Sequence, residues 1–171
     1  STSATVAPAA LVLGAHADAT VADVLAAYAE GFEAMGALAA AGHPALYDRG
    51  WHPTAVCGAV GAAVAAAALL GADRETAAGL AALRAGGLRA AFGSDGKSIQ
   101  VGLAASTGVA AARLAAAPAR APRDPTAPPP GGVFRGAGGP TPPARASPDP
   151  GEAWAVRLPS HPGTPRGRRP R

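Results

Sequence analysis

Two short polar segments interrupt a largely apolar sequence, and each carries a side chain suited to chemistry on an anion. Residues 47–54 read YDRGWHPT and include His52, whose imidazole can exchange a proton near neutral pH. Residues 91–98 read AFGSDGKS and include Lys97, whose ammonium group could hold a phosphate or a carboxylate. The residue types therefore allow proton transfer beside a carboxylate, or phosphate binding.

Each segment also has a purely structural interpretation. Trp51 could fill the core while His52 only caps or pairs, and spacing alone leaves this as open as catalysis. A phosphate-cradling loop of the form G-x-x-x-x-G-K-[ST] would need a glycine where Ala91 stands, and a strand before it. The preceding LAALRAGGLRAAF is not a strand, which argues against a nucleotide or phosphate binder.

The first helix that could support these segments is expected over residues 21–41. Thr20 and Asp23 form a plausible capping box at its start, and Gly42 is a suitable stop. Apolar residues recur at helical spacing and predict a core-facing stripe, namely Leu25, Tyr28, Phe32, Met35 and Leu38.

A second helix is expected from Pro53 or Thr54 to Leu70, because proline is well tolerated at the first helical position. Its sequence TAVCGAVGAAVAAAALLGA carries no charge, which permits a membrane-spanning interpretation. The length is borderline, alanine and glycine dominate, and basic flanks and interfacial aromatics are absent on the C-terminal side. We therefore expect a helix buried on all sides within the protein, and no membrane partner.

A third helix is expected over 73–91, with a weak point at Gly86 and Gly87, and a fourth over 99–117. On these boundaries Lys97 lies on the loop between the two helices. The expected fold class is therefore all-α.

Composition and charge divide the 171-residue chain near residue 117. Residues 1–117 carry 6 Lys or Arg against 8 Asp or Glu, whereas 118–171 carry 9 against 3. The second part also holds 15 of the 18 prolines, so we expect a helical domain over 1–117 and a largely disordered tail over 118–171. Because the positive charge lies in a tail with almost no aromatic platform, no nucleic-acid partner is expected.

Two motifs point to a known family. The sequence DRGWHPTAVCGAVGAAVAAAALLG is followed some twenty residues later by FGSDGKSIQVGLAASTGVAAARLAA, and both resemble the MmgE/PrpD family in order and spacing. The upstream DVLAAYAEGFEAM is similar to the family's helix before this site. The resemblance covers roughly residues 3–117.

The resemblance implies a cytoplasmic, usually homodimeric enzyme that needs no metal or cofactor and acts on a di- or tricarboxylate such as 2-methylcitrate. Its fold would combine a large all-α domain with a smaller α+β domain. Such enzymes are lyases or isomerases that begin with proton transfer beside a carboxylate. A single cysteine, Cys57, which we expect to be a small buried hydrophobe, fits a reducing compartment.

The family's site residues transfer by position onto this chain. Its active-site histidine falls on His52, as base or acid, and its substrate-contacting lysine falls on Lys97, as a point charge for a carboxylate assisted by backbone donors around 93–96. The weaker candidates for substrate binding are Thr54, Ser94, Asp95 and Gln100, the last at a position where members often have histidine.

The chain also departs from the family. A second active-site histidine would fall at or just before Ser1, and only a weak remnant of the second domain is recognisable over 151–158. We therefore expect an incomplete member. The alternative from another class is a non-catalytic helical fragment that serves as a dimerisation module.

Overall fold

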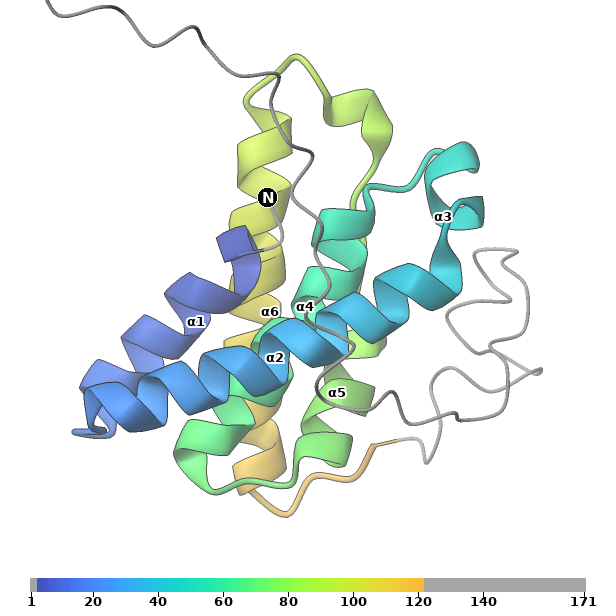
Figure 1. The fold of residues 1–171 in the computed structure, drawn as a ribbon. Helices are drawn as coiled ribbons and strands as arrows, with labels where there is room; N and C mark the ends of the chain where they lie inside the picture. The colour runs from blue at the N-terminus through green and yellow to red at the C-terminus, as the bar shows by residue number, and fades with distance from the viewer. Residues whose placement is uncertain (1–2, 122–171) are drawn as a thin grey trace, which may run out of the picture.

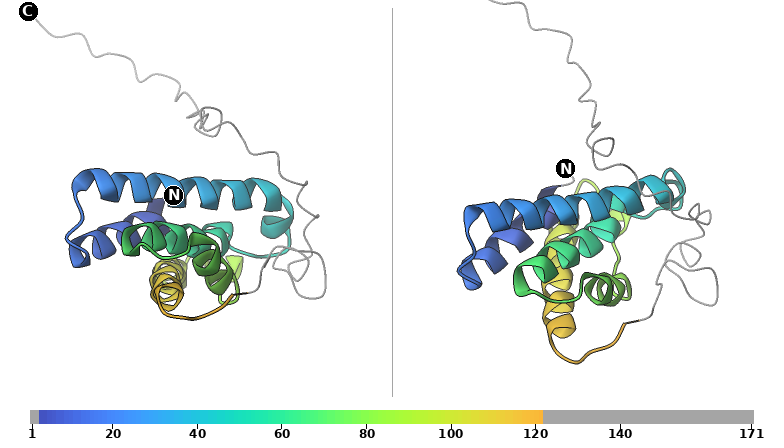
Figure 2. Two further views of the ribbon diagram at one scale, coloured as in Figure 1. Left: turned by 90° about the horizontal axis from the view of Figure 1, so that it is seen from below. Right: turned by 60° about the horizontal axis from the view of Figure 1, so that its bottom comes forward.

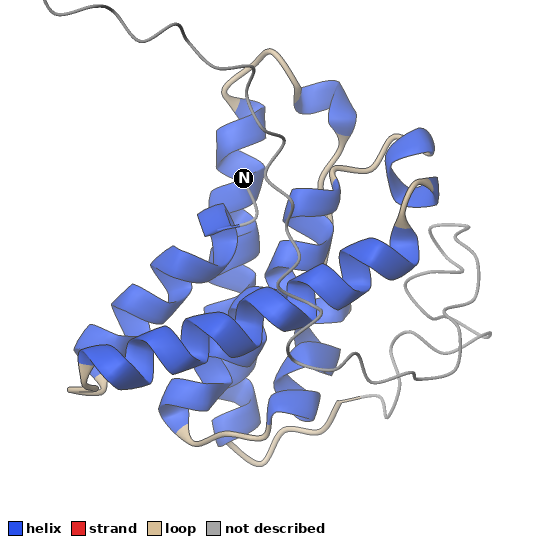
Figure 3. Cartoon of the chain, in the orientation of Figure 1, coloured by secondary structure: helices blue, strands red, loops and turns tan. Residues whose placement is uncertain are grey.

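The computed structural model describes residues 3–121. Of the tail predicted over 118–171, residues 122–171, with the 151–158 remnant, lie outside the described residues. Within 3–121 every regular element is a helix (Figures 1 and 3), so the all-α prediction is confirmed. The elements are α1 (Ser3–His16), α2 (Val21–Gly42), α3 (Ala45–Asp48), α4 (Pro53–Leu70), α5 (Arg74–Ala82), the 3-10 helix η1 (Arg89–Ala91) and α6 (Gly96–Ala116).

Helix α4 lies at the centre of the domain and packs against α1, α2, α5 and α6. Helix α2 crosses in front of α4 and α6 in Figure 1, and it forms the outer layer on one side when the molecule is turned in Figure 2. Twelve residues of α4 are buried, nine of them alanine or glycine, so the prediction of a buried central helix is confirmed.

Glycines allow the helices to approach closely. A Cβ on Gly31 of α2 would lie 2.4 Å from the carbonyl oxygen of Gly61 in α4, and a Cβ on Gly108 of α6 would lie 2.6 Å from the backbone nitrogen of Ala63. Real Cβ contacts are not this short, so these two crossings need glycine. The core is therefore built by close backbone approach rather than by large side chains.

The start signals of α2 and α4 are confirmed. Thr20 and Asp23 form the reciprocal capping box, since the Asp23 N–H donates to Thr20 Oγ1 at 3.2 Å and the Thr20 N–H donates to an Asp23 carboxylate oxygen at 3.0 Å. Pro53 is the first residue of α4, and Gly71 ends it with a left-handed φ of 62°. The core stripe on α2 was wrong at Leu25, which is 62% exposed, whereas Met35 is buried.

Helix α1 was not predicted, and two expectations about the other helices were wrong. The third helix ends at Ala82 instead of near residue 91, because residues 83–88 leave the helix and Gly87 has φ 140°. Helix α6 begins at Gly96, so Lys97 lies in the first helical turn and not on a loop.

Helices α2, α4 and α6 are long and apolar enough to cross a membrane by length and composition. Two thirds of the apolar window of α4 is buried inside the domain, against about a fifth for the windows of α2 and α6. Location inside or outside a membrane therefore stays a prediction.

Candidate functional site

His52 is fixed at the start of α4 by its backbone. Its N–H donates to the Gly87 carbonyl at 2.9 Å, and its own carbonyl accepts from the N–H groups of Ala55 and Val56 at 3.0 and 3.1 Å. The side chain is only 4% exposed and makes no cap hydrogen bond to α4. The simple capping interpretation of the imidazole is therefore not what the structure shows.

Gln100 is the hydrogen-bond partner of the imidazole. Its Nε2 lies 2.6 Å from Nδ1 of His52 and 3.2 Å from the Leu88 carbonyl oxygen, and its Oε1 accepts the Leu88 N–H at 2.9 Å. Gln100 comes from the second turn of α6, whereas Leu88 belongs to the extended segment that follows α5. The side chain predicted to bind substrate thus binds two parts of its own protein.

The ring of Phe92 connects His52 with Lys97. The His52 and Phe92 rings meet edge to face with centroids 4.8 Å apart, and Nζ of Lys97 lies 5.0 Å from the Phe92 centroid. The structure therefore brings both predicted site residues to one aromatic side chain, although 45 positions separate them in the sequence.

Burial lowers the pKa of His52 below its ordinary value of 6.5, and the positive charge of Lys97 lowers that pKa further. Both effects act in the same direction because each disfavours the imidazolium ion. His52 is therefore neutral at physiological pH in this structure.

The loop before α6 uses its backbone donors internally. The N–H groups of Ser94, Gly96 and Lys97 donate to Ala91 O, Ser94 Oγ and Ser94 O at 3.2, 3.3 and 3.2 Å. Ser94 Oγ in turn donates to Ala91 O at 2.8 Å. Two of the four amides expected to assist an anion over 93–96, those of Ser94 and Gly96, are thus already bonded within the loop, which weakens the case for a phosphate or carboxylate cradle built from the backbone.

The two other weaker candidates do not join the cluster formed by His52, Phe92, Lys97 and Gln100. Asp95 is exposed at the N-cap of α6 and makes no side-chain cap hydrogen bond. Thr54 is half-buried in the first turn of α4. The structure gives no contact that brings Thr54, Ser94 or Asp95 to the imidazole, and their substrate-binding role stays a prediction.

Sequence reasoning missed Arg89. Its backbone N–H donates to Gly50 O at 2.9 Å, its Nη1 donates to Tyr47 O at 2.9 Å, and its guanidinium lies 3.8 Å from the centroid of the Tyr47 ring. Trp51 and Leu88 also form an isolated antiparallel bridge. Together these contacts hold residues 47–51, which precede His52, against residues 88–89. No local motif marks Arg89, since its partners lie about forty positions away.

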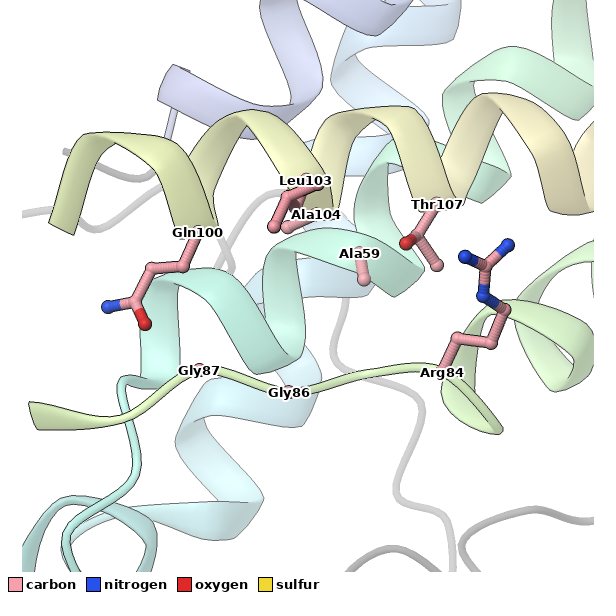
Figure 4. Close-up of a pocket in the computed structure, with 8 residues that line it drawn as sticks. All are labelled: Ala59, Arg84, Gly86, Gly87, Gln100, Leu103, Ala104 and Thr107. Atoms are coloured by element: carbon pink, nitrogen blue, oxygen red, sulfur yellow. The ribbon is translucent and has the colours of Figure 1, made fainter. Parts of the chain in front are cut away.

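A pocket of about 200 Å³ lies beside the cluster, between α4, α6 and the segment after α5 (Figure 4). Gln100 lines one end of this pocket and Arg84 and Thr107 line the other, whereas His52 and Lys97 do not line it. Within residues 3–121 no group of three His, Cys, Asp or Glu side chains is placed to hold a metal ion.

The fold and the cluster define an all-α domain in which a buried neutral histidine and an exposed lysine meet at one aromatic ring. The family model of the MmgE/PrpD N-terminal domain matches residues 1–144, and the chain belongs to the MmgE/PrpD family. The family prediction is therefore confirmed. Among curated protein sequences, none matches the chain with significance.

Proposed function

We propose that this chain is part of a metal-independent lyase-type enzyme that acts on a di- or tricarboxylate such as 2-methylcitrate, by proton transfer next to a carboxylate. The observation that carries the proposal is the meeting of His52 and Lys97 at Phe92. A cytoplasmic location and a homo-oligomeric state belong to the same proposal.

The chemistry of the two side chains supports this assignment. Loss of a proton beside a carboxylate produces an enolate-like dianion, so a site needs fixed positive charge and a hydrogen-bonding group where the negative charge grows. Lys97 supplies the charge from an exposed position, and His52 supplies an imidazole that is held rigidly by its backbone and by Gln100. Burial of the imidazole strengthens any hydrogen bond that it makes to an anion.

The proposal can be tested on Lys97 directly, because it is the sole lysine of the chain. Reductive methylation with ¹³C-formaldehyde keeps the positive charge and gives one side-chain NMR signal, with the terminal amine as an internal reference. Titration with 2-methylcitrate should shift the Lys97 signal saturably, and propionate or inorganic phosphate should do so at least tenfold more weakly.

Two variants sharpen this titration. Lys97→Met should weaken polycarboxylate binding, measured by calorimetry, by at least tenfold, whereas Arg113→Met should leave it unchanged because Arg113 lies exposed in the last turn of α6. No saturable shift, or equal binding by phosphate, would refute the carboxylate assignment.

The second candidate is a non-catalytic helical module that acts by self-association. Exposed apolar side chains near the site favour it, namely Leu88, Ile99 and Leu103, which are 54%, 59% and 62% exposed. Because the enzyme is also proposed to be homo-oligomeric, the two candidates differ in the titration: the module would self-associate in light scattering but give no response of Lys97 to 2-methylcitrate.

A further inference from the structure

The amide of Gln100 has a defined orientation. The Leu88 N–H can only donate, so the atom 2.9 Å from it is the amide oxygen, and the Leu88 carbonyl can only accept, so the atom 3.2 Å from it is the amide nitrogen. Both contacts of one backbone residue agree, which fixes Nε2 as the atom that faces His52.

This orientation determines which ring nitrogen of His52 carries the proton. Because Nε2 of Gln100 is a donor and lies 2.6 Å from Nδ1 of His52, Nδ1 must present its lone pair. A neutral imidazole then has its proton on Nε2. The tautomer with a proton on Nδ1 would place two donors against each other.

The other ring nitrogen has no hydrogen-bond partner among residues 3–121, and it is not among the fully buried side-chain atoms that lack one. His52 as a whole is only 4% exposed. The Nε2–H group is thus the polar group of the ring through which a ligand would have to bind.

We propose that Gln100 is a positioning residue that locks His52 in its Nε2–H tautomer, so that His52 offers a hydrogen bond to an anionic ligand and does not serve as the base. To act as a base through Nε2, a neutral His52 would need its lone pair on that atom. The hydrogen bond from Gln100 instead keeps the lone pair on Nδ1 and the proton on Nε2. The catalytic half of this inference rests on the function proposed above.

The lock assigns a specific step to His52. An Nε2–H donor with Lys97 nearby can bind a substrate carboxylate and stabilise negative charge on its oxygens without changing its own protonation state. Gln100 touches no substrate in this scheme.

Gln100 could instead only support the backbone at Leu88. The two roles differ in their effect on the imidazole, because a purely structural glutamine can be replaced without changing the tautomer or the titration of His52. The groups that face the ring are Gln100 from α6, Phe92 from the loop before it and the charge of Lys97, and only Lys97 among them is ionisable.

The experiment uses the full chain with ¹⁵N-labelled histidine. The chain has four histidines, and long-range ¹H–¹⁵N spectra report the tautomer of each, with His52 assigned from its missing signals in His52→Gln. We expect the Nε2–H tautomer for His52 at pH 7. In Gln100→Glu a carboxylate replaces the amide and accepts a hydrogen bond from a protonated Nδ1, which stabilises the imidazolium ion, so the midpoint of His52 should rise by about one pH unit or more.

Matched variants separate this effect from added charge and from misfolding. Ser106→Glu adds the same charge at an exposed position of α6 and should leave the tautomer and midpoint of His52 unchanged. Gln100→Met removes the hydrogen bonds at similar length and should give a mixture of the two tautomers.

An Nδ1–H tautomer in the unmodified chain would overturn the inference. A pure Nε2–H tautomer in Gln100→Met would also overturn it. If Gln100→Glu does not fold, the tautomer measured in Gln100→Met tests the inference on its own. These spectra need no ligand, so failure of the 2-methylcitrate titration and failure of the tautomer lock are distinguishable.

Discussion

The crossing of α4 and α6 at Gly108 gives the most sensitive test of how the site is held. A Cβ at position 108 would lie 2.5 Å from the Cβ of Ala62, 2.6 Å from the nitrogen of Ala63 and 2.7 Å from the carbonyl carbon of Ala62. Two of these atoms are backbone, so relief requires that the helices move apart. Gly108→Ala should therefore destabilise the domain even though alanine favours helices.

The magnitude follows from two opposing effects. Overpacking of a filled interface costs about 1–3 kcal/mol, and backbone contacts place this site at the upper end. Replacing a helical glycine by alanine returns about 1 kcal/mol. The net loss in the free energy of unfolding should be about 2 kcal/mol.

Gly102 provides the matched control on the same helix. Nothing lies within 4 Å of a Cβ at this exposed position, so Gly102→Ala should gain about 0.5–1 kcal/mol. Urea unfolding followed by far-UV circular dichroism measures both variants. Because α6 carries Gln100, Gly108→Ala should also weaken the 2.6 Å contact with His52 and loosen its tautomer. Equal stability changes in the two variants, or a more stable Gly108→Ala than Gly102→Ala, would refute the close-crossing argument.

Two further predictions concern groups that burial perturbs. The folded pKa of His52 lies below 6.5, so the unfolded state binds more protons as the pH falls below about 6.5, and the free energy of unfolding should decrease from pH 7 to 5. His52→Asn, which keeps an acceptor near the Nδ1 position, should flatten that part of the urea-derived stability profile, and an unchanged slope would contradict the assignment. Burial also raises the pKa of Cys57 to about 12, so a thiol reagent should label it only as fast as the domain opens, and immediate labelling of folded protein would show that the thiol is accessible.

Local signals predicted the elements whose ends are set by local chemistry. The capping box of α2 and the proline and left-handed glycine that bound α4 act within one helical turn, so they can be read from neighbouring residues. Helix α1 was not predicted, for two reasons. Its apolar periodicity is obscured because exposed Leu11 and Val12 lie beside buried Ala10 and Leu13, and Pro8 lies inside the helix.

The end of α5 and the geometry of the site depend on contacts between distant segments. The chain turns at residues 83–84 and then runs to Gly87 and Leu88, which bond to His52 and Gln100. The two motifs pointed to His52 and Lys97, but nothing local predicts that Gln100 bonds a histidine 48 positions earlier. The fold class was therefore accessible from the sequence, and the orientation of the imidazole was not.

The small side chains of α4 have a thermal consequence. Alanine and glycine bury little apolar side-chain surface, and helices that cross this closely also bury peptide groups. Exposure of apolar surface raises the heat capacity on unfolding, and exposure of polar surface lowers it. The heat-capacity change of unfolding should therefore fall below the average for globular proteins, which is about 12–15 cal/mol/K per residue. A smaller heat-capacity change flattens the dependence of stability on temperature. The domain should therefore keep a nearly constant margin of stability across the temperatures at which it works.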